Sequence, residues 1–177
     1  MELAAFSKLF GVFFSALLAG MIPSKSPFYT PKDLADETAI VGVFDKETPG
    51  GDSDSVSIER EGPAAYRFTL TGGGATTEFG ARLFRLKVAG APQPASYFLD
   101  LTPRQGAGHD LAAGAKHFAL MIGWEDGVIH LTPYRADLLP KKPPVLPGGT
   151  KRLQRFLREA VARGQFGYPC DLRRRYR

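Results

Sequence analysis

The sequence has few of the residues that usually carry chemistry. Its single cysteine, Cys170, excludes an intramolecular disulfide. Its three histidines, His109, His117 and His130, lack the short spacings that are typical of zinc ligands. No Gly-x-Ser-x-Gly motif is present, and the glycine-rich "TGGGAT" lacks the Lys-Ser/Thr pair of a phosphate-binding loop. The sequence therefore predicts no catalytic residue, no metal ligand and no cofactor.

Helical patterns are also scarce, because the 20 glycines and 14 prolines fall in clusters between short apolar runs. Several runs alternate apolar and polar residues, which is typical of strands with one buried face. The predicted strands cover residues 39–44, 55–60, 66–71, 76–88, 96–103, 116–124 and 127–134. The sequence thus predicts a mainly β domain of about seven strands, either an antiparallel meander or a small lipocalin-like barrel.

One amphipathic helix is expected at residues 150–164, "TKRLQRFLREAVARG". Leu153, Phe156, Leu157, Ala160 and Val161 form a single apolar stripe along it. We therefore expect the β domain with this C-terminal helix to span residues 39–164. Residues 165–177 are predicted to be a loosely ordered basic tail.

Basic charge is concentrated near the C-terminus. Residues 151–177 hold nine Lys or Arg against two acidic residues, whereas the whole chain has a net charge of +5. Near an anionic membrane each exposed cation contributes about 1 kcal/mol to binding. Six residues are the candidate contacts with an anionic surface: Lys151, Arg152, Arg155, Arg173, Arg174 and Arg175. The alternative interpretation is a solvated helix face followed by a frayed basic end.

The N-terminal region lacks charge over residues 9–22, "LFGVFFSALLAGMI". We predict that residues 1–22 form an apolar helix that acts as a signal peptide or membrane anchor. A buried core helix and an interfacial anchor are the alternatives. Residues 23–38 contain Pro23, Pro27 and Pro31 and are expected to be an extended, Pro-rich tether. These features predict an exported protein of the bacterial cell envelope, periplasmic or membrane-anchored.

The order of several short segments resembles a family of small bacterial envelope lipoproteins with a lipocalin-like barrel. The matching segments are "LLAGM", "YTPKDL", "AIVGVF", "YRFTL", "ARLFRL", "YFLDLTP", "HFALMI" and "LQRFL". Met21 stands where this family has its lipid-bearing cysteine, and a thioether cannot accept the diacylglyceryl group. Phe44 stands where the tryptophan of the barrel floor would be. The resemblance implies no catalytic residues.

The sequence thus favours a binding or scaffolding module of the cell envelope, with an apolar ligand in its interior or an envelope protein as its partner. Whether it is an enzyme stays open, with a non-enzymatic role favoured. An envelope hydrolase is the alternative, using carboxylates at the barrel mouth among Glu59, Glu61, Glu78 and Asp100. A structural partner of an envelope complex is a third hypothesis. The pI of 9.4 suits nucleic acid on charge alone, but export would keep it out of reach, so no nucleic-acid partner is expected.

Overall fold

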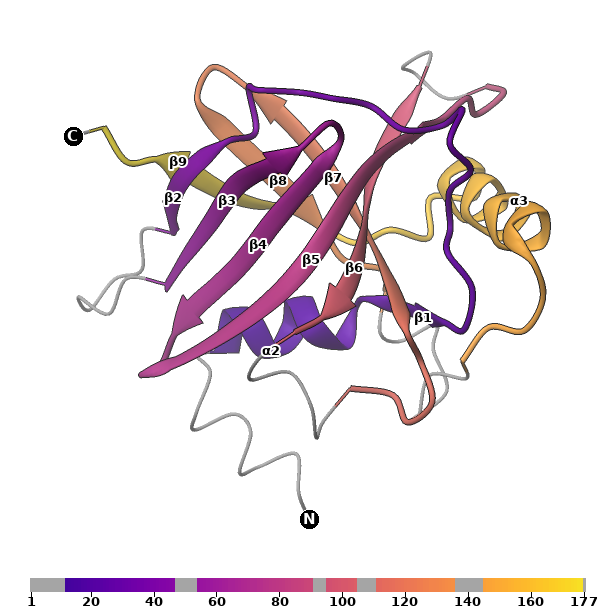
Figure 1. The fold of residues 1–177 in the computed structure, drawn as a ribbon, viewed down its shortest axis with the longest axis horizontal. Coiled ribbons are helices and arrows are strands. Elements are labelled where there is room, and N and C mark those ends of the chain that lie inside the picture. The colour runs from indigo at the N-terminus through magenta and orange to yellow at the C-terminus, as the bar shows by residue number, and fades with distance from the viewer. Residues whose placement is uncertain (1–11, 47–53, 91–94, 105–110, 136–144, 177) are drawn as a thin grey trace.

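The fold was analysed in a computed structural model, which describes residues 12–46, 54–90, 95–104, 111–135 and 145–176. These residues form nine strands and two helices (Figure 1). The helices are α2 (Val12–Ala19) and α3 (Thr150–Ala162). The strands are β1 (Ile22–Ser24), β2 (Gly42–Lys46), β3 (Asp54–Gly62), β4 (Ala65–Gly72), β5 (Ala75–Leu86), β6 (Ser96–Pro103), β7 (His117–Glu125), β8 (Val128–Thr132) and β9 (Cys170–Arg174).

Strands β2 to β9 form a closed barrel in which every neighbouring pair is antiparallel. The barrel closes at β9, which pairs with β8 on one side and with β2 on the other. Closure leaves no exposed edge on these strands. The short strand β1 lies outside the barrel ring and pairs with the first residues of β7. The expectation of an antiparallel β-barrel is therefore confirmed.

The expected strand count of about seven is too low, because two strands lie in segments that local patterns did not mark as strands. β9 lies within the predicted basic tail, and β1 lies at the end of the predicted leader. In β9 only Leu172 is fully buried, while its neighbours carry charge. Such a segment forms a strand because two partner strands supply hydrogen bonds to its backbone N–H and C=O groups. The periodicity of the sequence does not reveal that pairing.

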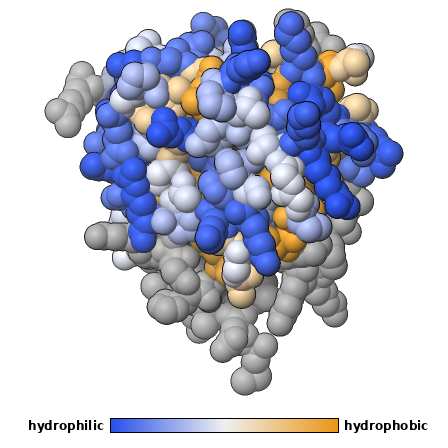
Figure 2. All heavy atoms as spheres, turned by 45° about the vertical axis from the view of Figure 1, so that its right-hand side comes forward, coloured by the Kyte–Doolittle hydropathy of each residue, from blue (hydrophilic) through white to orange (hydrophobic). Residues whose placement is uncertain are grey.

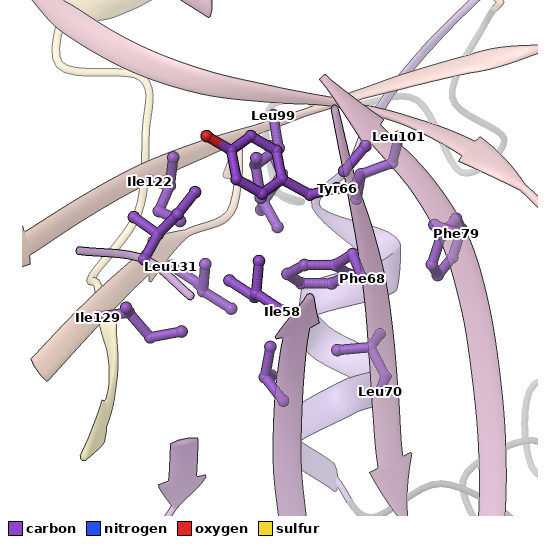
Figure 3. Close-up of a cluster of buried hydrophobic side chains, with 14 of the residues drawn as sticks. Ile58, Tyr66, Phe68, Leu70, Phe79, Leu99, Leu101, Ile122, Ile129 and Leu131 are labelled. Carbon is purple, nitrogen blue, oxygen red and sulfur yellow. The ribbon is translucent and has the colours of Figure 1, made fainter. Parts of the chain in front are cut away.

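The interior of the barrel is filled by apolar side chains of its strands, which point toward one another in Figure 3, together with Leu17, Met21 and Ile40. Phe44, Phe68 and Leu131, from three different strands, have no solvent-accessible surface. A side chain that bordered a water-sized cavity would have some accessible surface, so these side chains border no such cavity. The described interior thus has the close packing of an ordinary core rather than the lining of a ligand pocket.

The first described residues differ from the expected free leader helix. Leu17 and Met21 are 0% and 1% exposed and belong to the core of the barrel. In Figure 1, α2 lies beneath the barrel, with one side toward the strands. The apolar side chains that predicted a signal or anchor are thus also able to fill one end of the barrel. Among the described residues, no helix combines the length and apolar character that crossing a bilayer requires.

The segment expected to be a spacer also packs against the barrel. Phe28 is buried, and its N–H group donates to the carboxylate of Asp100 at 2.8 Å. Further along, residues 35–41 cross the upper end of the barrel in Figure 1. There the Tyr66 hydroxyl accepts the N–H of Glu37 at 2.7 Å, and Ile40 is buried in the core. Residues 12–41 therefore cover both ends and part of the outside of the barrel.

A second apolar core lies outside the barrel, under α3. It joins Phe84 of β5 and Phe98 of β6 to Leu153 and Leu157 of the helix. Ala160 is also buried, whereas Phe156 and Val161 are partly buried, so the predicted apolar stripe is confirmed. Burying a large apolar side chain contributes roughly 1.5–3 kcal/mol before entropy costs. This core fixes α3 on the outer face of β5 to β7.

Candidate functional site

The six predicted basic contacts fall at two separate places. Lys151, Arg152 and Arg155 lie in α3, whereas Arg173 and Arg174 lie in β9 and Arg175 follows directly. In Figure 1, α3 stands at the right of the barrel and the end of β9 at the left. The structure therefore divides the predicted site into two groups of three, with different surroundings.

Two of the three residues at β9 are engaged within the fold, whereas Arg173 is exposed. The Arg174 guanidinium donates to the carbonyl oxygens of Val41 at 2.8 Å and Ala39 at 2.6 Å, and it lies 5.0 Å from the ring centroid of Phe44. The Arg175 guanidinium makes a two-pronged ion pair with Asp45, with the Nε–Oδ2 distance at 2.7 Å. These contacts tie the last strand to β2 and to the chain before it. Their position is explained by closure of the barrel.

The group on α3 has different surroundings. Lys151, Arg152 and Arg155 are exposed, and within the described part of the chain none of them forms an ion pair. We define the α3 basic face by the residues Lys151, Arg152, Arg155, Arg158 and Arg163. Glu159 is the acidic residue that the helix sequence places among them. Figure 2 turns this side of the molecule toward the viewer and shows mostly hydrophilic side chains over its described part.

The start of α3 is electrostatically unfavourable. Gly149 is the N-cap residue, and no side chain caps the first turn. The first turn carries Lys151 and Arg152 but no acidic residue, so two cations lie near the positive end of the helix dipole. Each such charge costs roughly 0.3–1 kcal/mol when exposed at low salt. Helix stability therefore does not explain why these cations are here.

The buried side of α3 is held by polar contacts with the segment before β2. The Gln154 amide donates to the Phe28 carbonyl at 3.0 Å and to the Asp33 carboxylate at 2.7 Å. The Thr150 hydroxyl donates to the Pro27 carbonyl at 2.8 Å. Burial acts to raise the pKa of Asp33, but hydrogen bonds from Thr30 and Gln154 outweigh it and lower that pKa. The α3 basic face is thus presented on a helix with a fixed orientation.

Three of the four carboxylates of the hydrolase hypothesis, Glu59, Glu61 and Glu78, lie around Arg67 and Arg104, whereas Asp100 pairs with His117. The Arg104 guanidinium grips Glu61 with two bonds of 2.8 and 2.7 Å, and Arg67 adds a bond of 3.1 Å. Glu78 lies beside the same two arginines, 3.8 Å from Arg67 and 3.6 Å from Arg104. Hydrogen bonding from Arg104, against a smaller effect of burial, lowers the pKa of Glu61 to about 2. A general acid needs a raised pKa, so this cluster has the opposite property.

Sequence reasoning missed a buried Asp–His pair. Asp100 is 1% exposed, and its second carboxylate oxygen lies 2.8 Å from Nδ1 of His117. Because Asp100 also binds the Phe28 N–H, the pair holds the early segment against β6 and β7. The signal in the sequence is an aspartate inside the apolar run "YFLDL".

The remaining candidates for chemistry are spread out. His130 lies 2.6 Å from Asp171 in the neighbouring strand, as a partly exposed pair. Burial raises the pKa of the Cys170 thiol. In the described ranges no group of three or more His, Cys, Asp or Glu residues is arranged to hold a metal ion. His109 lies outside the described residues.

The fold defines the class of this protein as a closed antiparallel β-barrel of lipocalin-like type, with one additional strand and two helices. Comparison of the chain with protein-family models, with curated proteins and with solved structures finds no match. The resemblance to envelope lipoproteins is therefore untested and stays a prediction. The roles of the residues follow from their contacts and their chemistry alone.

Proposed function

We propose that this protein is a non-catalytic module that binds the anionic lipid surface of a membrane through the α3 basic face. The observation that carries the proposal is a set of three exposed cations without ion pairs, two of which, Lys151 and Arg152, oppose the helix dipole in the first turn. A charge that costs helix stability is best explained by a partner of opposite sign.

The packing of the barrel favours a role for its outer surface. The core side chains of the barrel are buried against one another, and residues 12–41 cover its two ends. In this state the interior offers no open pocket among its described residues. The sequence allowed either a ligand carrier or an interaction module, and this packing favours the interaction module.

The expected interaction is weak and sensitive to salt. Three unpaired cations contribute about 3 kcal/mol if each contributes about 1 kcal/mol at an anionic surface. Screening limits this attraction to within about 8 Å of the surface at physiological ionic strength. Binding of this kind retains a protein at a membrane only together with a second attachment, or while the membrane is strongly anionic.

A membrane fits the α3 basic face better than a single-stranded nucleic acid. Proteins that bind single strands place aromatic side chains among their cations, so that bases can stack on them. The aromatic residue of α3, Phe156, packs against Tyr134 with the ring centroids 5.8 Å apart. The cations instead lie along one helix on the outside of the barrel (Figure 1).

We also propose the cell envelope as the location, as the sequence predicted. The apolar N-terminal residues give this location only indirect support, because Leu17, Met21 and Ile22 are buried in the folded domain. The support that remains is the α3 basic face and the resemblance to envelope lipoproteins.

The test is sedimentation of the full chain with lipid vesicles at low salt. We expect binding to phosphatidylglycerol vesicles, little binding to phosphatidylcholine vesicles, and loss of binding in Lys151→Glu/Arg155→Glu. The matched control is Lys116→Glu/Arg173→Glu, which changes the net charge equally at exposed residues away from α3. Equal loss of binding in both variants would contradict the proposal. Tighter binding of the wild type to a single-stranded oligonucleotide than to the vesicles would also contradict it.

A further inference from the structure

The apolar side chains of α2 occupy one end of the barrel. Leu17 and Met21 belong to the same buried cluster as Phe79, Leu101 and Phe118, which come from three barrel strands. Figure 3 shows the helix directly behind the barrel side chains. The two side chains fill space that the strands enclose but do not fill themselves.

The other side of α2 is also apolar. The helix sequence, "VFFSALLA", contains no charged residue. Ala16 and Ala19 are nevertheless exposed, and Leu18 is only partly buried. A helix on a protein surface normally has a polar outer face, whereas a helix that is apolar all round is normally fully buried. Among the described side chains of α2, only Leu17 is fully buried in the apolar core.

The barrel closes without α2. Each of its eight strands pairs with two other barrel strands, and β1 has its own ladder to β7 that begins at Ile22. The chain is held just before β1, where the Tyr134 N–H donates to the Gly20 carbonyl at 2.9 Å. Gly20 also packs so closely on Pro133 that a Cβ atom would lie 2.2 Å from the proline Cβ. Displacement of α2 about this point leaves the strand ladders intact.

One polar group in this end of the barrel has no partner. Thr77 on β5 is 2% exposed, and its hydroxyl makes no hydrogen bond among the described residues. It pairs with Leu70 near the last residues of β4, at the end of the barrel under which α2 lies in Figure 1. A buried hydroxyl without a partner is unfavourable. An apolar plug leaves this donor unused, whereas a ligand with a carbonyl or carboxylate oxygen would use it.

We propose that α2 is a releasable plug and that the end of the barrel which it closes is a binding site for an acyl chain. With α2 in place, Leu17 fills the site beside Met21, which follows the fixed Gly20. With α2 displaced about Gly20, Met21 keeps its place, the acyl chain takes the space that Leu17 leaves, and the Thr77 hydroxyl donates to its polar end. The exposed apolar side of α2 gains a second apolar environment when the helix moves into lipid. This proposal does not depend on the α3 basic face.

The experiment compares Leu17→Asp with Ala16→Asp in the full chain. A carboxylate at the buried position 17 expels α2 from the barrel, whereas one at the exposed position 16 does not. The probe is N-phenyl-1-naphthylamine, a neutral fluorophore that the cations of α3 do not attract. In the wild type only the small fraction of molecules with α2 displaced can bind the probe, which weakens the apparent affinity by that fraction. We therefore expect the probe to bind Leu17→Asp about tenfold more tightly than it binds the wild type or Ala16→Asp. Dodecanoate should displace it.

Two results would overturn the plug. In one, Leu17→Asp loses the cooperative thermal transition of the strands in circular dichroism, which would make α2 an inseparable part of the core. In the other, this variant folds but binds the probe no better than Ala16→Asp does. Adding Thr77→Val to Leu17→Asp tests the polar contact. We expect the added substitution to weaken dodecanoate binding about fivefold and to leave binding of the neutral probe unchanged. Unchanged dodecanoate binding would exclude Thr77 as the donor.

Discussion

Arg152 and Arg174 show how the same side chain takes different roles according to its neighbours. Arg174 lies against the carbonyls of Val41 and Ala39, so its charge is used within the fold. Arg152 has no such partner and lies in the first turn of α3. Both were predicted as surface contacts because composition reports charge and not its surroundings. The carbonyls that bind Arg174 are more than a hundred residues away in the chain, so no local pattern could reveal them.

Glu61 makes a prediction about pH at the scale of one residue. Its pKa is lowered from 4.5 to about 2, chiefly because Arg104 bonds to its charged form. The stabilisation from this shift is therefore fully present above pH 4.5 and is lost as pH falls toward 2. We expect Glu61→Gln to be less stable than the wild type at neutral pH, with a difference that shrinks in this acidic window. Urea unfolding at several pH values measures the free energy of unfolding of both proteins. A difference between them that stays constant with pH would show that the ion pair of Glu61 with Arg104 is not its cause.

At the scale of the element, α3 combines a well-packed inner side with an unfavourable first turn. Its apolar stripe was predicted correctly, because a repeat of 3.6 residues is a local property of the sequence. Thr150 is a good N-cap residue in principle, but it is the first residue of the helix and Gly149 is the N-cap. In the structure the Thr150 hydroxyl instead binds the Pro27 carbonyl. A tertiary contact has here replaced the local capping role.

Charge reversal in α3 should separate stability from function. In Lys151→Glu/Arg152→Glu, acidic residues replace cations near the positive end of the helix dipole, so we expect the free energy of unfolding to rise by about 1 kcal/mol. Arg163→Glu places an acidic residue at the other end of α3 and should lower the free energy of unfolding. Urea denaturation at low salt measures both. If the double variant is less stable than the wild type, the two cations contribute to the fold.

At the scale of the whole molecule, the antiparallel arrangement was predictable, whereas the strand β9 that closes it into a barrel was not. The strands β3 to β8 carry alternating or apolar runs between turn residues, and β7 and β8 are joined by Asp126-Gly127, a dipeptide typical of hairpins. The packing of the described residues 12–41 and 165–176 was not predictable in this way. Their apolar, Pro-rich or basic composition suggested a leader, a tether and a tail. Their packing depends on partners far away in sequence, such as Phe28 with Asp100 and β9 with β2.

Leu172 provides the test of this closure. It is fully buried in the barrel core from the middle of β9, the strand that completes the ring. Truncating a buried leucine removes its apolar contacts and leaves a cavity, so Leu172→Ala should lower the free energy of unfolding by about 2–5 kcal/mol. The neighbouring Arg173 is exposed, and Arg173→Ala should change it by less than about 0.5 kcal/mol. Chemical denaturation of both variants decides whether this segment is a structural strand, because in a loosely ordered tail the two substitutions would have equally small effects.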